Sequence, residues 1–336
     1  MLDTDKGPIL VTGGGGFLGK EIARMLCRLN LEVRSISRQF YAELDQLGVQ
    51  QTQSDLSNYN TVGKAFEGCQ LVFHVAAKAG IWGDPSDFYN SNVIGTRNVI
   101  KGCLENGVRR LVYTSSPSVV FNGQDMDGVD ESVPYGSQFT AHYPETKAVA
   151  EKEVLSRNGP LLATVALRPH LIWGPDDPHI IPGLIRRARQ GHLRRIGNED
   201  KLVDFTHIQN AAHAHLLAAN NLTANSPIAG KVYFITDDQP EPLWDFVNKL
   251  LKAGELPPIR KRVNRKIAYL AASILETLHR FLNRSGEPRI TRFLVEELAT
   301  SHWFDISAAK QDLGYSPIIS RQEGLAQVRK WLKEKG

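Results

Sequence analysis

Short apolar runs alternate with segments of helical periodicity over the first half of the chain. The run at 8–12, PILVT, ends in glycines, and 17–29 then repeats apolar residues every three or four positions. This order is typical of a buried parallel strand followed by a crossover helix. The same pattern predicts further strands at 31–37, 49–54, 70–75, 108–115 and 163–168, and further helices at 59–66, 88–106 and 143–157.

Strands that alternate with helices of crossover length predict an α/β protein with a doubly wound parallel sheet, the Rossmann fold. A long loop is expected over 117–142, where Gly, Pro, Asp and Ser gather. After Pro169 the rhythm loosens, although 231–236 is expected to return to the sheet as a strand. We therefore expect a Rossmann domain over 1–170 and a smaller, mostly helical C-terminal lobe over 171–336.

The amino-acid composition mainly excludes certain classes of protein and site. The chain is 42% hydrophobic and 23% charged, and its net charge of +4 is too small to predict nucleic-acid binding. The three cysteines, Cys27, Cys69 and Cys103, suit neither a disulfide framework nor a metal site, so we expect reduced thiols in a cytoplasmic protein without metal. Residues 1–8 lack the apolar segment of a secretion signal, and no apolar run is long enough to span a bilayer.

A glycine-rich turn follows the first predicted strand. Gly13, Gly16 and Gly19 stand between that strand and a helix that begins with Phe17 and Leu18. Glycine is needed where backbone turns tightly beside a pyrophosphate, and the N-terminus of the helix offers free N–H groups to it. A turn without a ligand is the alternative, but the flanking strand and helix favour a dinucleotide site.

The second predicted strand ends in Ser37 and Arg38. Enzymes that use NAD usually carry an acidic residue there, which binds the ribose 2′-hydroxyl. A guanidinium in its place can bind a 2′-phosphate, so we predict NADP(H), although a solvated arginine is the alternative. Asp55, which Leu56 follows, is a candidate contact for the adenine amine or else a helix N-cap.

Tyr143 and Lys147 lie four positions apart at the start of a predicted helix, so both side chains leave one face. Ser115 and Ser116 end the fifth strand, at the edge of the sheet where such folds bind ligands. Reduction of a ketone needs a proton donor, and a nearby ammonium should lower the pKa of a phenol toward neutrality. A serine hydroxyl can hold the substrate oxygen. A surface i, i+4 pair is the alternative.

These motifs resemble the extended short-chain dehydrogenases, and more closely their 3β-hydroxysteroid dehydrogenase-like branch. Within that branch the chain is most similar to the bacterial reductases of 2-alkyl-3-oxoalkanoates. The superfamily motifs are TGGGGFLG (12–19), YPETK (143–147), LRP (167–169) and WGP (173–175). The segments that point to the narrower group are AAKAGIWG (76–83), YTSSPSV (113–119), PYG (134–136), TRFL (291–294) and HW (302–303).

The resemblance implies Ser116, Tyr143 and Lys147 as catalytic residues, with Ser116 preferred to Ser115. It also implies that Asn92 supports the helix beside the site, and that His74 replaces a frequent asparagine with little loss. The expected cofactor-binding residues are Gly13, Gly16, Phe17, Leu18, Gly19, Ser37, Arg38, Asp55, Leu56, Ala76, Ala77, Lys78, Tyr143 and Lys147.

The implied reaction is NADPH-dependent reduction of the 3-keto group of a long-chain 2-alkyl-3-oxo acid, a step of olefin formation, with the C-terminal lobe binding the substrate. The alternatives are a 3β-hydroxysteroid or sterol dehydrogenase and a non-enzymatic NADP(H) sensor. Lys78 is a candidate contact for the substrate carboxylate or else a solvated lysine. The resemblance also implies a homodimer through 88–106 and 143–157.

An apolar helix is expected over 267–282. Basic residues flank it on both sides: Arg260, Lys261, Arg262, Arg265 and Lys266, then Arg280, Arg284, Arg289 and Arg292. The pattern favours packing on the core or as a substrate lid, and peripheral contact with a membrane interface is the alternative.

Overall fold

Seven parallel strands form the central sheet in the computed structural model of the protein, which describes residues 7–197, 199–282 and 286–335. In sheet order they are β3 (Gln50–Gln53), β2 (Val33–Ser37), β1 (Ile9–Thr12), β4 (Leu71–His74), β5 (Arg110–Thr114), β7 (Ala163–Pro169) and β12 (Val232–Ile235). The order reverses between β1 and β4, and both strands are fully buried. The predicted doubly wound sheet is confirmed, and ligands of such sheets bind at this reversal.

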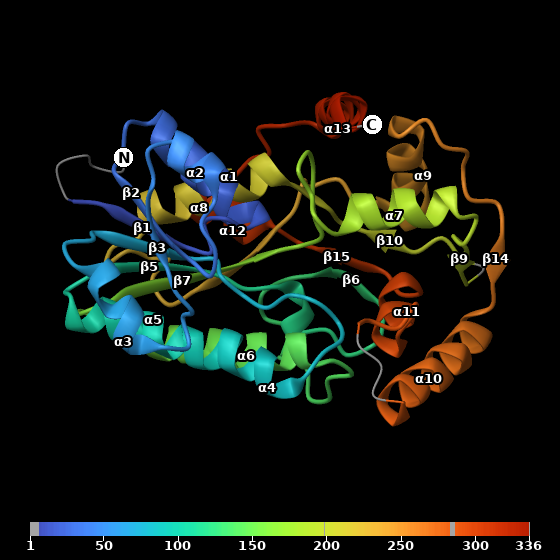
Figure 1. Cartoon of the computed structure of the whole chain (residues 1–336), viewed down its shortest axis with the longest axis horizontal. Helices are drawn as coiled ribbons and strands as arrows, with labels where there is room; N and C mark the ends of the chain where they lie inside the picture. The colour runs from blue at the N-terminus through green and yellow to red at the C-terminus, as the bar shows by residue number, and fades with distance from the viewer. Residues whose placement is uncertain (1–6, 198, 283–285, 336) are drawn as a thin grey trace.

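Helices cover both faces of the sheet (Figure 1). One layer holds α1 (Phe17–Arg28), α2 (Ala42–Gln46), α8 (Ile208–Asn221) and α12 (Ser307–Leu313); the other holds α3 (Tyr59–Val62), η2 (Gly63–Phe66), α5 (Gly95–Glu105) and α6 (His142–Ser156). Although α8 and β12 come late in the sequence, α8 packs on α1 and β12 pairs with β7. The domain boundary near residue 170 stays a prediction, as does the homodimer.

The helix expected over 88–106 is divided into three parts. A short helix α4 (Pro85–Phe88) leads into a π-helical turn η3 (Tyr89–Ile94), and only then does α5 begin. A π turn inserts an extra residue into the helical register, which hydrophobic spacing does not reveal. Here it aims Asn92 into the space between the sheet and α6.

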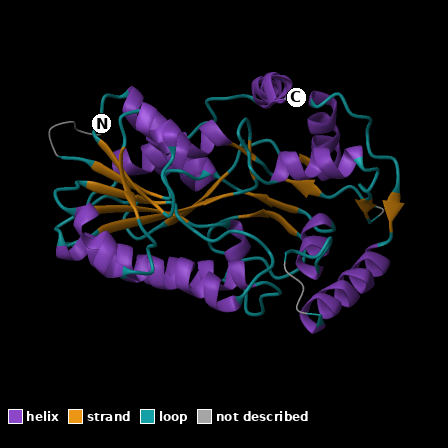
Figure 2. Ribbon diagram, viewed as in Figure 1, coloured by secondary structure: helices purple, strands orange, loops and turns teal. Residues whose placement is uncertain are grey.

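The C-terminal lobe adds small sheets to its helices (Figure 2). Its strands are β6 (Met126–Val129), β8 (Ile172–Trp173), β9 (Arg195–Ile196), β10 (Leu202–Val203), β11 (Thr206–His207), β13 (Glu241–Pro242), β14 (Arg262–Val263) and β15 (His302–Phe304). Its helices are α7 (Ile180–Arg189), α9 (Leu243–Ala253), α10 (Arg265–Phe281), α11 (Arg292–Leu298) and α13 (Arg321–Lys335). The uninterrupted loop expected over 117–142 is therefore wrong: η4 (Pro117–Val119) and β6 lie within it, and β6 pairs with β15.

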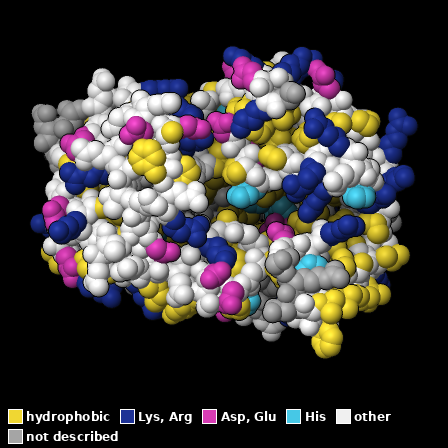
Figure 3. All heavy atoms as spheres, in the orientation of Figure 1, with side chains coloured by type: hydrophobic (Ala, Val, Ile, Leu, Met, Phe, Trp, Pro, Cys, Tyr) yellow, Lys and Arg dark blue, Asp and Glu magenta, His cyan; other side chains and the backbone are white. Residues whose placement is uncertain are grey.

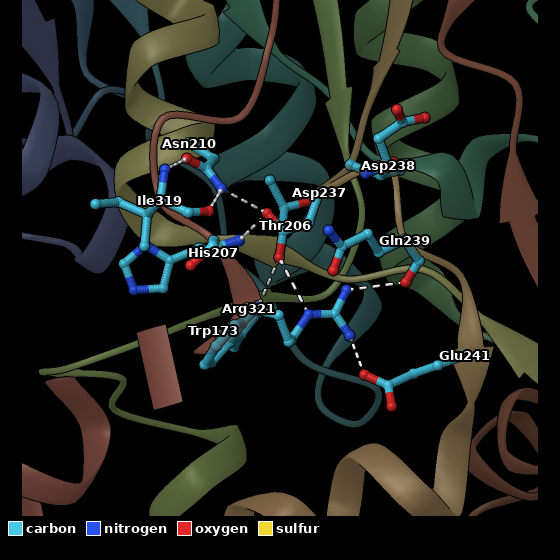
Figure 4. A network of polar contacts seen from close by, with 12 residues as sticks. Trp173, Thr206, His207, Asn210, Asp237, Asp238, Gln239, Glu241, Ile319 and Arg321 are labelled. Atoms are coloured by element: carbon cyan, nitrogen blue, oxygen red, sulfur yellow. Dashed lines mark hydrogen bonds and ion pairs between the residues drawn. The ribbon is translucent and has the colours of Figure 1, made fainter. Parts of the chain in front are cut away.

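A buried polar network joins this lobe to the sheet (Figure 4). The carboxylate of Asp237, just after β12, accepts hydrogen bonds from the His207 backbone N–H (2.8 Å) and from Trp173 Nε1 (3.1 Å). It also accepts one from Asn210 Nδ2 (2.8 Å), and Arg321 Nε lies 3.8 Å away. A buried charge is costly without such hydrogen-bond partners. The network fixes the segment of Trp173 against α8 and α13.

All three cysteines are free thiols: Cys69 and Cys103 are buried, and Cys27 is partly buried. Within the described residues, no cluster of three or more His, Cys, Asp or Glu side chains is placed to hold a metal ion. No helix in the described ranges combines the length and apolarity needed to cross a membrane.

Candidate active site

The glycine turn after β1 has no room for side chains. Gly13 has φ +70°, and a Cβ there would lie 2.8 Å from the Cα of Ala76. At Gly15 a Cβ would lie 2.0 Å from the ring of Tyr41. Gly16 caps α1 without a side-chain hydrogen bond, so the first N–H groups of that helix stay available. This backbone cradle suits a pyrophosphate.

The end of β2 lies beside the same turn. The hydroxyl of Ser37 accepts a hydrogen bond from the Gly15 N–H (3.3 Å), and Arg38 is exposed to solvent. Asp55 accepts from the N–H (2.8 Å) and the hydroxyl (2.7 Å) of Ser57. Those bonds, with a smaller contribution from Arg38, lower the pKa of Asp55. Asp55 thus caps the local turn at Ser57, whereas Asn58 is the N-cap of the following helix α3, so the N-cap alternative for Asp55 is wrong.

One residue of this region has no recognisable signal in the sequence. Gln51, on β3, accepts a hydrogen bond from the backbone N–H of Tyr41 (2.9 Å) and donates one to its carbonyl (3.0 Å). Gln51 therefore fixes the segment whose tyrosine ring lies against Gly15. A glutamine in a weak strand reads as a solvated side chain, so only the folded register exposes this role.

A buried histidine ties β4 to its neighbours at the reversal of strand order. His74 Nδ1 lies 2.8 Å from Thr12 Oγ1, and His74 Nε2 lies 2.8 Å from Thr96 Oγ1. Burial, with a contribution from Lys147, lowers the pKa of His74 to about 3, so the ring is neutral. Thr12 Oγ1 also accepts from the Ala76 N–H (3.3 Å), which brings the end of β4 beside the glycine turn.

Tyr143 and Ser116 come together at the end of β5. Burial raises the pKa of Tyr143, and a hydrogen bond with the Ser116 hydroxyl opposes that rise. Ser116 Oγ also accepts from the N–H (3.2 Å) and the hydroxyl (2.9 Å) of Ser118. Ser115 is buried, and its Oγ has no partner within the described structure. The geometry therefore pairs Ser116, rather than Ser115, with the phenol.

Lys147 is buried below this pair, with 2% of its surface exposed. Its Nζ donates to the carbonyl of Thr114 (2.5 Å) and lies 4.1 Å from the centre of the Tyr113 ring. Burial lowers the pKa of Lys147 to about 7, although Glu151 acts in the opposite direction. The sequence predicts that the ammonium lowers the pKa of Tyr143; in the structure Ser116 is the group that does so.

Glu151 follows Lys147 by one helical turn and belongs to a fully buried ion pair. Arg168, from the LRP segment, donates to both of its carboxylate oxygens, at 2.5 and 3.0 Å. The hydroxyl of Tyr135, from the PYG segment, donates to Glu151 Oε1 (2.7 Å). Two motifs noted in the sequence thus support the helix that carries Tyr143 and Lys147.

Asn92 joins the cofactor side of the sheet to the same helix. Its Oδ1 accepts from the backbone N–H of Lys78 (2.7 Å), and its Nδ2 donates to the Lys78 carbonyl (3.1 Å) and to Thr146 Oγ1 (3.0 Å). The Lys78 ammonium contacts Asp87 (2.5 Å) and the Phe88 ring. A substrate carboxylate at Lys78 would therefore compete with Asp87.

Glu297, on α11, is an acid near the phenol that the sequence did not single out. Burial, with a contribution from Glu296, raises the pKa of Glu297 to about 7. Its charge in turn raises the pKa of Tyr143. Its backbone carbonyl accepts from His302 Nε2 (2.8 Å), which places the HW segment behind it.

The two groups of residues occupy one edge of the sheet. The glycine turn, Ser116 and Lys78 all follow the carboxyl ends of central strands, and α6 brings Tyr143 to the same edge. The face drawn in Figure 3 is hollowed near its middle, between the two lobes. A dinucleotide-binding cradle beside a tyrosine, a serine and a buried lysine can support proton exchange at an oxygen atom next to a redox cofactor.

Comparison with known proteins points to the same chemistry. The sequence model described as "3-beta hydroxysteroid dehydrogenase/isomerase family" matches residues 10–263. A 2-alkyl-3-oxoalkanoate reductase of Shewanella oneidensis is 47% identical over 95% of this chain and 84% of its own length. One of Stenotrophomonas maltophilia is 46% identical over 96% and 98%. The mouse sterol-4-alpha-carboxylate 3-dehydrogenase, decarboxylating, is 35% identical over 94% and 88%.

Solved structures share the fold. The crystal structure of gox2253 superposes with a TM-score of 0.80 at 27% identity and covers 98% of this chain and 99% of its own. MoeE5 in complex with UDP-glucuronic acid and NAD gives a TM-score of 0.74 at 24% identity, over 98% and 100% of the two chains. At that identity the likeness concerns the fold alone.

Proposed function

Because the chain belongs to the 3-beta hydroxysteroid dehydrogenase/isomerase family of extended short-chain dehydrogenases, we propose that it reduces a long-chain 2-alkyl-3-oxoalkanoate to the 3-hydroxy acid with NADPH. The protein is an oxidoreductase that uses a nicotinamide dinucleotide and acts on a small molecule. The narrower proposal rests on the bacterial reductases at 46–47% identity and on the pairing of Tyr143 with Ser116. Long-chain olefin formation is the process that the resemblance assigns to it.

The names of the relatives share one piece of chemistry. A 2-alkyl-3-oxoalkanoate carries its ketone one carbon away from the carbon that bears the carboxylate, and a sterol 4-carboxylate with oxygen at C3 has the same arrangement. The proposed substrate class is therefore a β-keto acid or the corresponding β-hydroxy acid. The bulk of the alkyl part, which differs between the two groups, would be selected by the C-terminal lobe.

The residues of the chain divide the work as follows. Gly13, Gly16 and the N-terminus of α1 would hold the pyrophosphate, and the nicotinamide, when bound, supplies the hydride equivalent. Ser116 would hold the substrate oxygen by a hydrogen bond, and Tyr143 would deliver the proton to it. Lys147 would fix the end of β5 that carries Ser116, because its Nζ donates to the Thr114 carbonyl, and the Ser116 hydroxyl lowers the pKa of the phenol.

The proposal of NADP(H) over NAD(H) rests on Arg38. It stands exposed where an acidic residue would bind the ribose hydroxyl. We expect kcat/KM to be at least about tenfold higher with NADPH than with NADH, and Arg38→Ala to remove most of that difference. Arg28→Ala, at the exposed end of α1, is the matched control. A wild-type preference for NADH would refute this part.

The main test is turnover against a panel: a 2-alkyl-3-oxo acid, a 3-ketosteroid and a UDP-sugar. Running it in reverse with 2-alkyl-3-hydroxy acids avoids spontaneous loss of CO₂ from the keto acid. We expect the alkyl acid to be preferred, and Tyr143→Phe to lower kcat about 100-fold or more while dinucleotide binding persists. If Tyr143→Phe turns over normally, the proposed chemistry is wrong and a dinucleotide-sensing role gains support.

A sterol dehydrogenase is the second candidate, since sterol-4-alpha-carboxylate 3-dehydrogenases are 34–38% identical. If a 3-hydroxysterol 4-carboxylate is added to the panel, a sterol dehydrogenase would oxidise it with release of CO₂. Lys78→Ala tests the carboxylate contact, and KM for the acid should rise. An unchanged KM would mean that the Lys78 ammonium pairs with Asp87 and not with the substrate.

A further inference from the structure

Helix α10 turns its large apolar side chains toward solvent. The exposed residues recur at intervals of three and four, so they form one stripe along the helix. They are Ile267 (64% exposed), Leu270 (62%), Ile274 (51%), Leu278 (46%) and Phe281 (85%), with Leu282 (49%) beyond its end. A helix of a soluble domain normally buries this stripe. The packing on the core that the sequence favoured is therefore wrong for these residues.

The opposite face of α10 explains why the helix does not rotate about its axis to bury the stripe. Its buried residues are Ala268, Ala272 and Glu276. The Glu276 carboxylate accepts from the backbone N–H (2.6 Å) and from Nε (2.8 Å) of Arg292, at the start of α11. Turning the apolar stripe inward would leave this buried carboxylate without its partner, which is costly. The exposed orientation is thus held by a polar clamp.

Basic side chains surround the stripe. Arg260, Lys261, Lys266, Arg280 and Arg289 are exposed, whereas the acidic residues of 260–289 are Glu276, which is buried, and Glu287. In Figure 3 the yellow side chains gather at the lower right, where Figure 1 places α10, with dark blue ones beside them. Arg284 lies outside the described residues. An apolar stripe with a basic border fits the interface of an anionic bilayer.

The C-terminal end of α10 also contacts a loop that leads away from the candidate active site. The ring of His279 meets Trp82 edge-on at 6.2 Å, and the guanidinium of Arg280 lies 5.4 Å from the Trp82 ring. Trp82 belongs to the loop that begins with Lys78, directly after β4. The C-terminal end of α10 is therefore in contact with a loop of the cofactor side.

We propose that α10 docks the protein on the surface of an anionic lipid bilayer, with its apolar stripe in the interface and its basic residues on the headgroups. A helix of 17 residues lying flat would insert its stripe by about 5–10 Å without crossing the bilayer. If the proposed function holds, docking brings the loop of Trp82 to the membrane from which a long-chain acid would enter. The docking itself does not depend on that function.

The test is co-sedimentation of the full chain with vesicles. Phosphatidylcholine vesicles with about 30% phosphatidylglycerol should bind the protein at low salt, and pure phosphatidylcholine vesicles much less. Binding should weaken as salt rises. Leu270→Glu and Ile274→Glu should each lower the partition coefficient about tenfold or more. Leu161→Glu, at a site 66% exposed at the amino end of β7, should bind like the wild type.

All three substitutions are at exposed positions, so Tm and turnover of a short, water-soluble substrate should stay unchanged. Absence of vesicle binding by the wild type at low salt would overturn the proposal, as would equal binding by Leu270→Glu and Leu161→Glu. Light scattering tests whether a second copy of the chain covers the stripe instead. If Leu270→Glu dissociates an oligomer and neither the wild type nor any variant binds vesicles, the stripe is an interface between copies of the chain. Failure of the substrate panel alone would leave docking intact.

Discussion

Replacing Lys147 by methionine should abolish activity and yet stabilise the fold. The side chain is 2% exposed, and its ammonium has one carbonyl partner, Thr114, and the face of Tyr113. Methionine has a similar length and carries no charge that must be buried. The substitution therefore separates the effect of a buried ammonium on the free energy of folding from its effect on turnover.

The magnitude follows from the pKa of Lys147, which burial lowers from 10.5 to about 7. At pH 8 folding must remove a proton that the unfolded chain still binds, which costs about 3 kcal/mol at ~1.4 kcal/mol per pH unit. The variant avoids this cost but loses the hydrogen bond to Thr114, which offsets about 1 kcal/mol of the gain. Lys147→Met should thus stabilise the protein by about 2 kcal/mol at pH 8.

The sign of the pH dependence is a sharper test than the magnitude. Between pH 7 and 10.5 the unfolded chain binds more protons at this lysine than the folded chain does, so the stability of the wild type rises with pH. Lys147→Met lacks this contribution. Its advantage should shrink by about 1.4 kcal/mol per pH unit above pH 8 and vanish near pH ~9.5, because the lost hydrogen bond to Thr114 then outweighs what is left of it.

The assay is thermal unfolding at a series of pH values. For a chain of this length 1 kcal/mol corresponds to roughly 1.4 °C, from an unfolding entropy of about 2.1 cal/mol/K per residue. Lys147→Met should therefore melt about 3 °C above the wild type at pH 8 and level with it near pH ~9.5. Lys152→Met, an exposed lysine on the same helix, is the control and should show no such trend. A constant difference for Lys147→Met across pH 7–10 would refute the burial argument.

Three further substitutions test the supports of the site. Arg168→Met leaves the Glu151 carboxylate buried without its partner and should cost about 3–5 kcal/mol of stability, measured by denaturant unfolding. Gly13→Ala places a Cβ 2.8 Å from the Cα of Ala76 at φ +70°, so dinucleotide affinity should fall about tenfold or more; unchanged titration of dinucleotide fluorescence would contradict this. Asn92→Leu should lower kcat through misplacement of α6 while Tm falls by only a few degrees, since the residue holds backbone rather than substrate.

The parts of the fold that are local in sequence could be predicted. Strand β1, the glycine turn and α1 are consecutive, so hydrophobic spacing and Gly13 define them together. The four-residue spacing of Tyr143 and Lys147 likewise places both on α6. Such features need no knowledge of distant segments, because their physical cause lies within a few residues.

Other parts depend on partners far along the chain. Strand β6 is the short segment MDGV, which contains a glycine and becomes a strand by pairing with β15, near residue 303. The π turn at Asn92 and the clamp of Gln51 on Tyr41 also have no local pattern. The exposure of α10 was misjudged for a related reason: spacing shows that a helix has an apolar face, but not which face the rest of the fold covers.

Arg168 of the LRP motif affects the pKa of Lys147 through the charge of Glu151. Glu151 lies one turn beyond Lys147, and a free carboxylate there would hold the lysine protonated and raise its pKa. Arg168 instead donates hydrogen bonds to both carboxylate oxygens of Glu151, so the guanidinium neutralises much of that negative charge. Burial then lowers the pKa of Lys147 to about 7, although Glu151 still acts in the opposite direction. Arg168 thus influences the protonation of Lys147 through Glu151, without contacting Lys147 itself.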